Sequence, residues 1–236
     1  MKLSIITVTY NAENDIIPTM ESILKQYNSD FELIIVDGCS NDKTLKMVED
    51  YNERFQYMRI ISEPDNGIYD AMNKGVALAK GEYVFFLNAG DVLFDNTVFD
   101  KVLPSLNGID VYYGDSYRIS NGLLKPFRSG EFTKYRLAVI NICHQTIFYP
   151  RMLLLENPYN LDYILGADHA LNMLLWEKRP FKYVNFPISL YKGDGVSENG
   201  LNKDKKFVKD YKWLVASRLG IDALIYLAIK RLIARF

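Results

Sequence analysis

The sequence has few residues of the kinds that bind soft metals. Its 236 residues include two cysteines, Cys39 and Cys143, and two histidines, His144 and His169. The cysteines lie far apart and in no metal-ligand spacing, so a zinc site is not expected and any metal should be a hard ion held by oxygen atoms. The first residues are too short and too poor in apolar side chains for a secretion signal, which favours a cytoplasmic location.

Glycine-rich phosphate loops and internal repeats are also missing. No G-x-G-x-x-G follows the first predicted strand, which disfavours a dinucleotide oxidoreductase. The segment at that place, Thr9–Glu13, is neither glycine-rich nor basic, which disfavours a nucleotidyltransferase that makes nucleotide sugars. No low-complexity linker divides the chain, and its length suits one globular unit.

Charge is distributed unevenly. The formal net charge is −1, yet the part of the chain from Lys203 onward holds nine basic and three acidic residues, so the remainder is acidic. An acidic body gives no reason to expect a nucleic-acid partner. A basic, apolar tail suits an anionic membrane surface.

No run in this tail is long enough to span a membrane. Leu219–Phe236 is predicted to be a helix that is apolar around most of its circumference, but its longest uncharged run, Ala223–Ile229, has seven residues. A spanning helix needs roughly 20. The pattern predicts peripheral attachment to the cytoplasmic leaflet of the membrane, with packing on the body or pairing in a homodimer as the alternative.

The first half alternates predicted strands with predicted helices. Short β-branched runs indicate strands at Leu3–Tyr10, Phe31–Val36, Met58–Ser62 and Glu82–Leu87, with amphipathic segments between them. This order predicts an α/β fold with a Rossmann-like, mostly parallel central sheet flanked by helices.

The pattern changes after about residue 108. An Asn121-Gly122 turn signal separates two strand-like segments. We expect residues 108–200 to extend the sheet of residues 1–107, and residues 201–236 to form a helical tail. The expected elements of the second half are strands at Val111–Tyr117, Leu123–Phe127, Gln145–Tyr149 and Lys182–Tyr191, and a helix at Asp168–Lys178.

Small polar residues follow each of the first four strands. In open α/β sheets ligands bind beyond the carboxyl ends of the strands, where Thr7–Asn11, Asp37, Glu63–Gly67 and Asn88–Asp91 are expected. Any one of these segments could serve only as a cap or turn. Together they favour a binding site.

Asn88–Asp91 places a carboxylate beside two small residues at a strand end. A diphosphate leaving group needs charge neutralisation, which Mg²⁺ or Mn²⁺ bound to Asp91 would supply. The alternative is a β-turn in which Asp91 caps the helix expected near Thr97.

Four ordered segments resemble the family 2 glycosyltransferases of the GT-A fold, in particular the bacterial subgroup that assembles capsule, exopolysaccharide and O-antigen units. The likeness is close over residues 1–115, and Cys143–Phe148 and Gly166–His169 look like acceptor-side segments. It implies one GT-A domain at 1–200, with a nucleotide-binding half at 1–107 and an acceptor-side half at 108–200. The four segments are Ser4-Ile-Ile-Thr-Val-Thr-Tyr-Asn11, Val36-Asp-Gly-Cys-Ser-Asn-Asp-Lys-Thr44, Glu63-Pro-Asp-Asn-Gly-Ile-Tyr-Asp-Ala-Met-Asn-Lys-Gly75 and Phe86-Leu-Asn-Ala-Gly-Asp91.

The resemblance assigns the donor site. Asp37 would accept a hydrogen bond from uracil and Asp91 would bind Mn²⁺ or Mg²⁺. Family members often carry further carboxylates where this chain has Asn88 and Gly90. That difference weakens the expected metal affinity, and supports the alternative of a non-catalytic domain that binds a sugar nucleotide or a partner protein. The other implied donor-binding residues are Thr7, Tyr10, Asn11, Asp65 and Asn88.

An inverting transfer needs a carboxylate that takes a proton from the acceptor hydroxyl. Asp168 holds the family's base-like position, although it could merely cap a helix over Ala170–Lys178. His144 and Gln145 could contact sugar hydroxyls of the acceptor, although a half-buried histidine is an equal alternative. Lys192, in the glycine-rich segment Tyr191–Gly200, could offset leaving-group charge, although a plain surface loop competes.

The sequence therefore predicts an inverting glycosyltransferase. Its donor would be a nucleotide diphosphate sugar with uridine as the nucleoside. Its acceptor would be a glycan, lipid-linked in bacterial surface polysaccharide synthesis.

Overall fold

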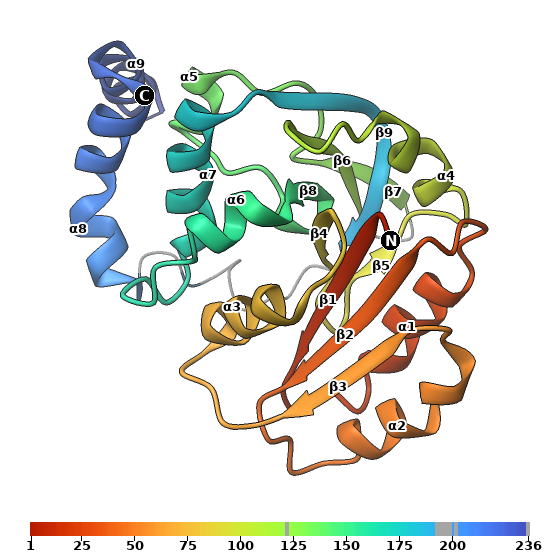
Figure 1. Cartoon of the computed structure of the whole chain (residues 1–236). Coiled ribbons are helices and arrows are strands. Elements are labelled where there is room, and N and C mark those ends of the chain that lie inside the picture. Colours follow the sequence, from red (N-terminus) through yellow and green to blue (C-terminus); the bar gives the residue numbers. More distant parts are fainter. Residues whose placement is uncertain (121–122, 192–199, 201–202, 235–236) are drawn as a thin grey trace.

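A nine-stranded sheet runs through the whole molecule (Figure 1). The computed structural model describes residues 1–120, 123–191, 200 and 203–234. The strand order is β3-β2-β1-β4-β8-β6-β9-β5, and β7 pairs with β6 outside this path. The strands are β1 (Leu3–Thr9), β2 (Phe31–Asp37), β3 (Met58–Ser62), β4 (Tyr83–Phe86), β5 (Val92–Leu93), β6 (Val111–Ser120), β7 (Leu123–Phe127), β8 (Ile147–Pro150) and β9 (Phe181–Tyr191).

Helices cover both faces of the sheet. Side chains of α1, α2 and α4 belong to one buried apolar cluster, and side chains of α3, α6 and α7 belong to another. In α1 the buried residues Ile16, Met20 and Ile23 recur at helical spacing, which is why one face of this helix packs on the sheet. The body helices are α1 (Ile16–Leu24), α2 (Thr44–Asp50), α3 (Ile68–Leu78), α4 (Val98–Val102), α5 (Lys134–Leu137), α6 (Arg151–Glu156) and α7 (Ala167–Lys178).

The first four strands are parallel, as the sequence predicts. All seven residues of β1 are buried, which explains its uncharged, β-branched sequence. β1 pairs with β2 on one side and β4 on the other, and Thr9 lies opposite Asp37 at the end of the β1–β2 ladder. The polar residues that follow these strands therefore meet at one edge of the sheet.

The second half continues the same sheet, which confirms that prediction. β8 pairs with β4 and with β6 in antiparallel orientation, whereas β9 runs parallel to β6. The sheet is parallel from β3 to β4 and mixed beyond it. In the β6–β7 hairpin the pairing is antiparallel because the chain returns directly, without a helical crossover.

One local expectation needs adjustment. The strand expected from Gln145 begins at Ile147, because His144–Thr146 form a 3₁₀ turn in which the Thr146 hydroxyl donates to the Cys143 carbonyl over 2.8 Å. β6 and β7 pair as the expected hairpin from Ser116↔Phe127 to Ser120↔Leu123. The turn residues predicted for it, 121–122, lie outside the described residues.

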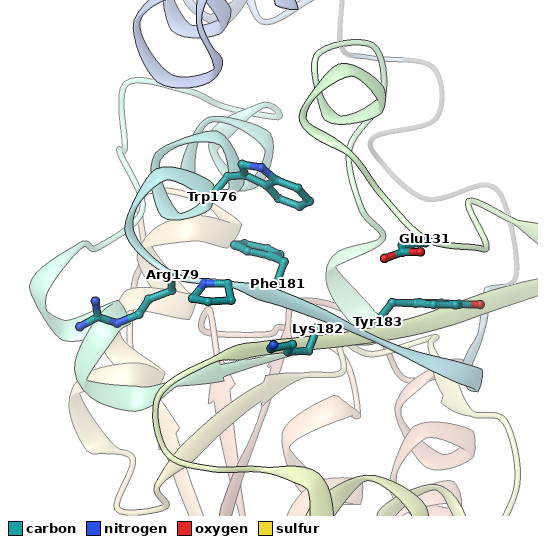
Figure 2. Close-up of a pocket in the computed structure, with 7 residues that line it drawn as sticks. Glu131, Trp176, Arg179, Phe181, Lys182 and Tyr183 are labelled. Atoms are coloured by element: carbon teal, nitrogen blue, oxygen red, sulfur yellow. The ribbon is translucent and has the colours of Figure 1, made fainter.

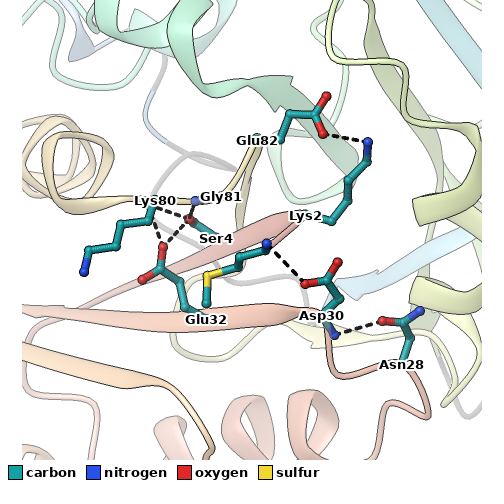
Figure 3. Close-up of polar contacts among 9 residues, drawn as sticks. Lys2, Ser4, Asn28, Asp30, Glu32, Lys80, Gly81 and Glu82 are labelled. Carbon is teal, nitrogen blue, oxygen red and sulfur yellow. Dashed lines mark hydrogen bonds and ion pairs between the residues drawn. The ribbon is translucent and has the colours of Figure 1, made fainter.

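The amino-terminal edge of the sheet is closed by polar contacts (Figure 3). The buried Glu32 carboxylate accepts hydrogen bonds from the Ser4 hydroxyl and from the Lys80 backbone amide, each over 2.6 Å. Lys2 pairs with Glu82 over 2.6 Å. The contacts to Glu32 satisfy its buried charge at the sheet edge opposite the strand-end residues. This edge therefore contributes to stability.

The carboxyl-terminal segment folds as two helices on the outside of α7 (Figure 1). They are α8 (Lys205–Leu214) and α9 (Ile221–Ile233), joined by a π-helical turn (Val215–Leu219) and by Gly220 at φ 99°. One face of this pair is buried with the body, through Phe207, Tyr211, Leu214, Ala223 and Leu227. Within the described residues, no helix is both long and apolar enough to cross a membrane.

Candidate active site

Asp37 lies at the centre of the edge formed by the ends of β1 and β2. Its side chain is fully buried, and one carboxylate oxygen accepts hydrogen bonds from the Ser40 amide over 3.0 Å and from the Ser62 hydroxyl over 2.7 Å. The Ser40 hydroxyl donates to its other oxygen. These donors fix the carboxylate where the nucleotide is predicted to bind.

Tyr10 and Asp65 approach each other over Gly38. A Cβ atom at Gly38 would lie 2.6 Å from Asp65 Oδ2 and 3.4 Å from Tyr10 Cδ2. Tyr10 is 61% exposed, so its ring is available to a ligand. The glycine is therefore required by a close approach of side chains, and the structure brings the predicted donor residues Tyr10 and Asp65 together at the residue that follows Asp37.

Asn11 connects β1 to the segment after β2. It has a left-handed backbone, φ 48°, and its side-chain oxygen accepts a hydrogen bond from the Asn41 amide over 2.8 Å. The Ser40 hydroxyl accepts one from the Asn11 amide over the same distance. An asparagine tolerates this conformation better than most residues, so Asn11 shapes the donor edge through its backbone.

The hydroxyls of Thr7 and Thr9 differ in their hydrogen bonding. Thr7 is fully buried, and its hydroxyl donates to the Leu87 carbonyl over 2.8 Å, which ties β1 to the chain after β4. The buried Thr9 hydroxyl has no hydrogen-bond partner in the described residues. Thr9 belongs to the strand-end segment Thr7–Asn11 that the sequence singles out.

The predicted metal-binding segment forms a tight turn after β4. The Asp91 amide donates to the Asn88 carbonyl over 3.0 Å, and Gly90 has φ 99°. Thr19 of α1 holds the turn, since its hydroxyl donates to the Asp91 carbonyl over 2.7 Å. The alternative role of Asp91 as a helix cap is wrong, because the N-cap of α4 is Thr97, six residues further along the chain.

The donor set at this turn fits a hard divalent cation only in part. No group of three or more His, Cys, Asp or Glu residues with metal-binding geometry occurs among the described residues. The Asn88 side-chain oxygen is buried without a hydrogen-bond partner in the described structure, beside the Asp91 carboxylate in sequence. Mg²⁺ commonly uses one or two protein oxygens and takes the rest from phosphates and water, so this pair suffices in number.

His144 connects this turn to a cavity of about 530 Å³ on the other side of the site. Its Nε2 lies 3.1 Å from the Asn88 side-chain nitrogen. Burial lowers the pKa of His144, so the ring is neutral at pH 7 and can accept that hydrogen bond. The cavity is lined by Phe127, Arg128, Val139, Ile140, Asn141, Cys143, His144, Gln145, Leu165, Asp168, His169, Tyr191 and Tyr211.

Asp168 presents a partly exposed carboxylate to this cavity. One oxygen accepts from the Tyr69 hydroxyl over 3.1 Å, and the other from the Asn141 side-chain amide over 2.8 Å. The alternative that Asp168 caps a helix over Ala170–Lys178 is wrong, because α7 begins at Ala167 and has Gly166 as its N-cap. Asp168 lies inside the first turn, with both oxygens oriented by other elements.

Gln145 is 1% exposed, and its side-chain oxygen faces the Cys143 sulfur over 3.0 Å. Burial raises the pKa of the Cys143 thiol to about 12, which keeps it protonated. Both residues line the cavity. The predicted role of Gln145 in binding an acceptor stays a prediction.

Sequence reasoning missed Tyr69, Asn141 and Arg128. Tyr69 and Asn141 contact Asp168 from 99 and 27 residues away in the chain, so no local pattern could have revealed them. Arg128 lines the cavity with a left-handed backbone, φ 51°. Lys192, predicted as a second cation, lies outside the described residues.

Residues 4–166 match the family described as Glycosyl transferase family 2. A "PGL/p-HBAD biosynthesis glycosyltransferase" of Mycobacterium bovis is 35% identical over 233 residues, which cover 95% of this chain and 88% of the relative. The "Chondroitin synthase" of Escherichia coli is 30% identical over 193 residues, which cover 78% of this chain and 28% of the synthase.

Solved structures share the fold at lower identity. S. aureus TarS 1–349 superposes with a TM-score of 0.74 at 21% identity, over 92% of this chain and 65% of TarS 1–349. The mannosyltransferase PcManGT of Pyrobaculum calidifontis, in complex with GDP-Man and Mn²⁺, has a TM-score of 0.63 at 14% identity, over 100% of this chain and 81% of PcManGT. The strand-end residues, the shared fold and the family match agree: this chain belongs to glycosyl transferase family 2 and has the GT-A fold.

Proposed function

We propose that the chain is an inverting glycosyltransferase that moves a sugar from a uridine diphosphate donor to the hydroxyl of a glycan acceptor. The observation that carries this proposal is the placement of Asp168. Its carboxylate faces the cavity of about 530 Å³, which His144 connects to the Asn88–Asp91 turn. Donor and acceptor bound on the two sides would meet between these groups.

Asp168 would act as the general base. It takes the proton from the acceptor hydroxyl as that oxygen attacks the anomeric carbon, and the bond from that carbon to the diphosphate oxygen breaks on the opposite face. Hydrogen bonds from the Tyr69 hydroxyl and the His169 amide occupy one carboxylate oxygen, and the bond from Asn141 leaves a lone pair of the other oxygen, Oδ2, for the acceptor. A positioned base of this kind contributes about 10²–10⁴-fold to rate.

A uridine nucleotide is favoured by the donor edge. Asp37 is fixed by three donors and can accept from a ring N–H, and the exposed Tyr10 ring can stack on a flat base. TarS, which has this fold, has been crystallised with UDP and with UDP-GlcNAc. PcManGT is in complex with GDP-Man, so the nucleoside of the donor used by this chain needs a direct test.

Asp91 and the side-chain oxygen of Asn88 would hold Mn²⁺ or Mg²⁺. The bound ion would neutralise negative charge that develops on the leaving diphosphate. The two residues are held in one turn by Thr19, through bonds of 2.7 Å and 3.0 Å to the Asp91 carbonyl and from the Gly90 amide. The segment is therefore preorganised without the ion.

We propose that the acceptor is lipid-linked and that α9 rests on the anionic surface of the cytoplasmic leaflet. One face of α9 leaves five large apolar side chains more than half exposed, and Lys230 and Arg231 stand near its end. Apolar side chains beside basic ones suit an interface of anionic headgroups. The exposed residues are Ile221, Ile225, Ile229, Leu232 and Ile233.

A panel of nucleotide sugars incubated with the purified chain and Mn²⁺ tests the activity. With methanol as a substitute acceptor, we expect slow consumption of one uridine diphosphate sugar, and the methyl glycoside, which does not mutarotate, should have the inverted configuration by NMR. Tight binding of a donor that stays intact would support a non-catalytic binding domain. Cleavage with retained configuration would exclude Asp168 as the base of an inverting transfer.

Co-sedimentation with vesicles tests the membrane contact. The full chain should pellet with phosphatidylcholine vesicles only when these contain phosphatidylglycerol, and Ile225→Glu with Ile229→Glu should abolish it. Ile109→Glu is the matched control, because this residue is 59% exposed and lies away from α9. A dimer that becomes a monomer in the double variant, with no vesicle binding by either protein, would show instead that α9 pairs with a second copy.

A further inference from the structure

A second cavity of about 530 Å³ opens where α7 ends and β9 begins (Figure 2). The cavity beside Asp168 includes Tyr191, the last residue of β9, whereas this one includes Tyr183, near its start. The β6 residues that pair with Tyr183 and Tyr191 are Tyr113 and Arg118, five residues apart, so roughly 17 Å of strand separates the two. The two cavities share no lining residue, so the second is distinct from the one beside Asp168, although its Glu131 follows Arg128 of the other lining by three residues. It is lined by Glu131, Trp176, Arg179, Pro180, Phe181, Lys182 and Tyr183.

Aromatic rings form one wall of this cavity and are fixed in place. The Trp176 and Phe181 ring centroids are 4.9 Å apart, and those of Tyr113 and Tyr183 are 5.6 Å apart. The Tyr183 hydroxyl donates to Asp115 over 2.8 Å, which holds its ring. A preorganised aromatic surface of this kind can stack on the apolar face of a ligand with little loss of side-chain entropy.

Three charged side chains stand around these rings. Glu131, Arg179 and Lys182 are exposed, and none of them forms an ion pair with another described residue. Among the described residues, the only hydrogen bond from the Arg179 guanidinium goes to the carbonyl of Lys178, over 3.0 Å. In Figure 2 Glu131 lies across the hollow from Trp176 and Phe181. No ion pair among the described residues therefore uses these three charges.

We propose that this cavity is a second glycan-binding site, which takes a sugar unit that carries an acidic group. Trp176 and Phe181 would stack on the apolar face of the ring, Glu131 would accept hydrogen bonds from hydroxyls, and Arg179 and Lys182 would pair with the acid. The proposal rests on the proposed function for its ligand, which would be the acceptor glycan. Binding here would hold a long acceptor while its growing end lies at Asp168.

Tryptophan fluorescence tests this site without any turnover. The chain has two tryptophans, and Trp213 is 60% exposed on α8, so a Trp213→Phe background assigns the signal to Trp176. Titration with an unsulfated chondroitin octasaccharide should change this signal saturably, with and without UDP. Arg179→Gln with Lys182→Gln should weaken binding at least tenfold, and both residues are exposed, so the fold should persist in circular dichroism.

The control variant carries Lys230→Gln with Arg231→Gln, the same change in charge on α9. Equal weakening by this control would show attraction to net charge only and would overturn the site. The same response to inorganic phosphate, or to maltooctaose, would overturn the acidic-sugar assignment, as would absence of any signal change. The titration measures binding directly, so a chain without transferase activity could still bind the octasaccharide. Failure of this proposal can therefore be distinguished from failure of the proposed function.

Discussion

The two sides of the active site are built in different ways. The donor edge at Thr9, Tyr10, Asp37 and Asp65 is made of short turns, and hydrogen bonds such as Asn41 to Asn11 and Ser62 to Asp37 link neighbouring segments. The cavity around Asp168 is made by residues far apart in the chain, with Tyr69 and Tyr211 from helices on either side of α7. One side is fixed by turn chemistry and the other by tertiary packing, so substitutions should act on them differently.

The largest effect is expected on the packed side. Asp168→Asn should lower transfer by about 10²-fold or more, because the amide cannot accept the acceptor proton. Donor affinity should stay the same, since the donor edge is separate. Initial rates and donor titrations measure the two quantities. Near-normal turnover, or loss of folding, would show that Asp168 only supports the packing of Tyr69 and Asn141.

Asp91→Ala should act on the turn side and remove the dependence of donor binding on metal. Loss of a direct ligand should lower metal affinity by more than the roughly 10–100-fold that loss of an outer-shell partner costs. Titration of Mn²⁺ in the presence of UDP measures it. Asp37→Ala is the comparison, because it should weaken nucleotide binding equally with and without metal. An unchanged Mn²⁺ requirement in the Asp91 variant would exclude this site.

The packed side should also be sensitive to acid through His169. This ring is 4% exposed, lies 2.7 Å from the Leu137 carbonyl and packs on Phe207, and burial lowers its pKa to about 4. The unfolded chain binds the proton below about pH 6.5, so stability falls as the pH drops from there toward 4. Between pH 7 and pH 5 the loss is about 2 kcal/mol.

Urea unfolding at the two pH values measures this loss. His169→Gln should unfold more easily at pH 7 yet lose less of its stability between pH 7 and pH 5, since it cannot titrate. His144 is the other histidine, and His144→Gln should leave most of the dependence in place. Equal pH dependence of the wild type and the His169 variant would contradict the assignment.

The smallest effect is expected from Gly38→Ala on the turn side. The added Cβ would sit 2.6 Å from Asp65 Oδ2, so Asp65 must shift, and nucleotide affinity should fall by about tenfold, or about 1.4 kcal/mol. Calorimetric titration of UDP measures it. If Asp65 transmits the effect, Gly38→Ala with Asp65→Ala will bind UDP no more weakly than Asp65→Ala alone. Additive losses would place the clash elsewhere.

The same difference between turns and tertiary packing explains which site residues could be predicted from the sequence. The first four strands and Asp37, Asp65 and Asp91 follow a local pattern, in which β-branched runs end in small polar residues. The partners of Asp168 follow none, because Tyr69 belongs to α3 and looks like any apolar helix residue. Cap chemistry also misled, since the helix considered for Asp91 has Thr97 as its N-cap.

The tail was predicted in part. Its helical character follows from apolar periodicity, but the break at Gly220 and the burial of Phe207 and Tyr211 depend on the body. Asp222 accepts from Tyr135 over 2.8 Å and pairs with Lys134 over 2.6 Å, which attaches α9 to α5. No sequence pattern pairs residues 87 positions apart.

The strand order has a consequence for folding and for work with fragments. β8 lies between β4 and β6, so the first half ends in an unpaired sheet edge until residues 147–150 arrive. A chain cut near residue 107 would expose the buried, apolar edge of Tyr83–Phe86, which favours aggregation. Pairings of such long sequence separation also slow folding. The two halves should therefore be produced as one chain, because neither half of the sheet is complete without the other.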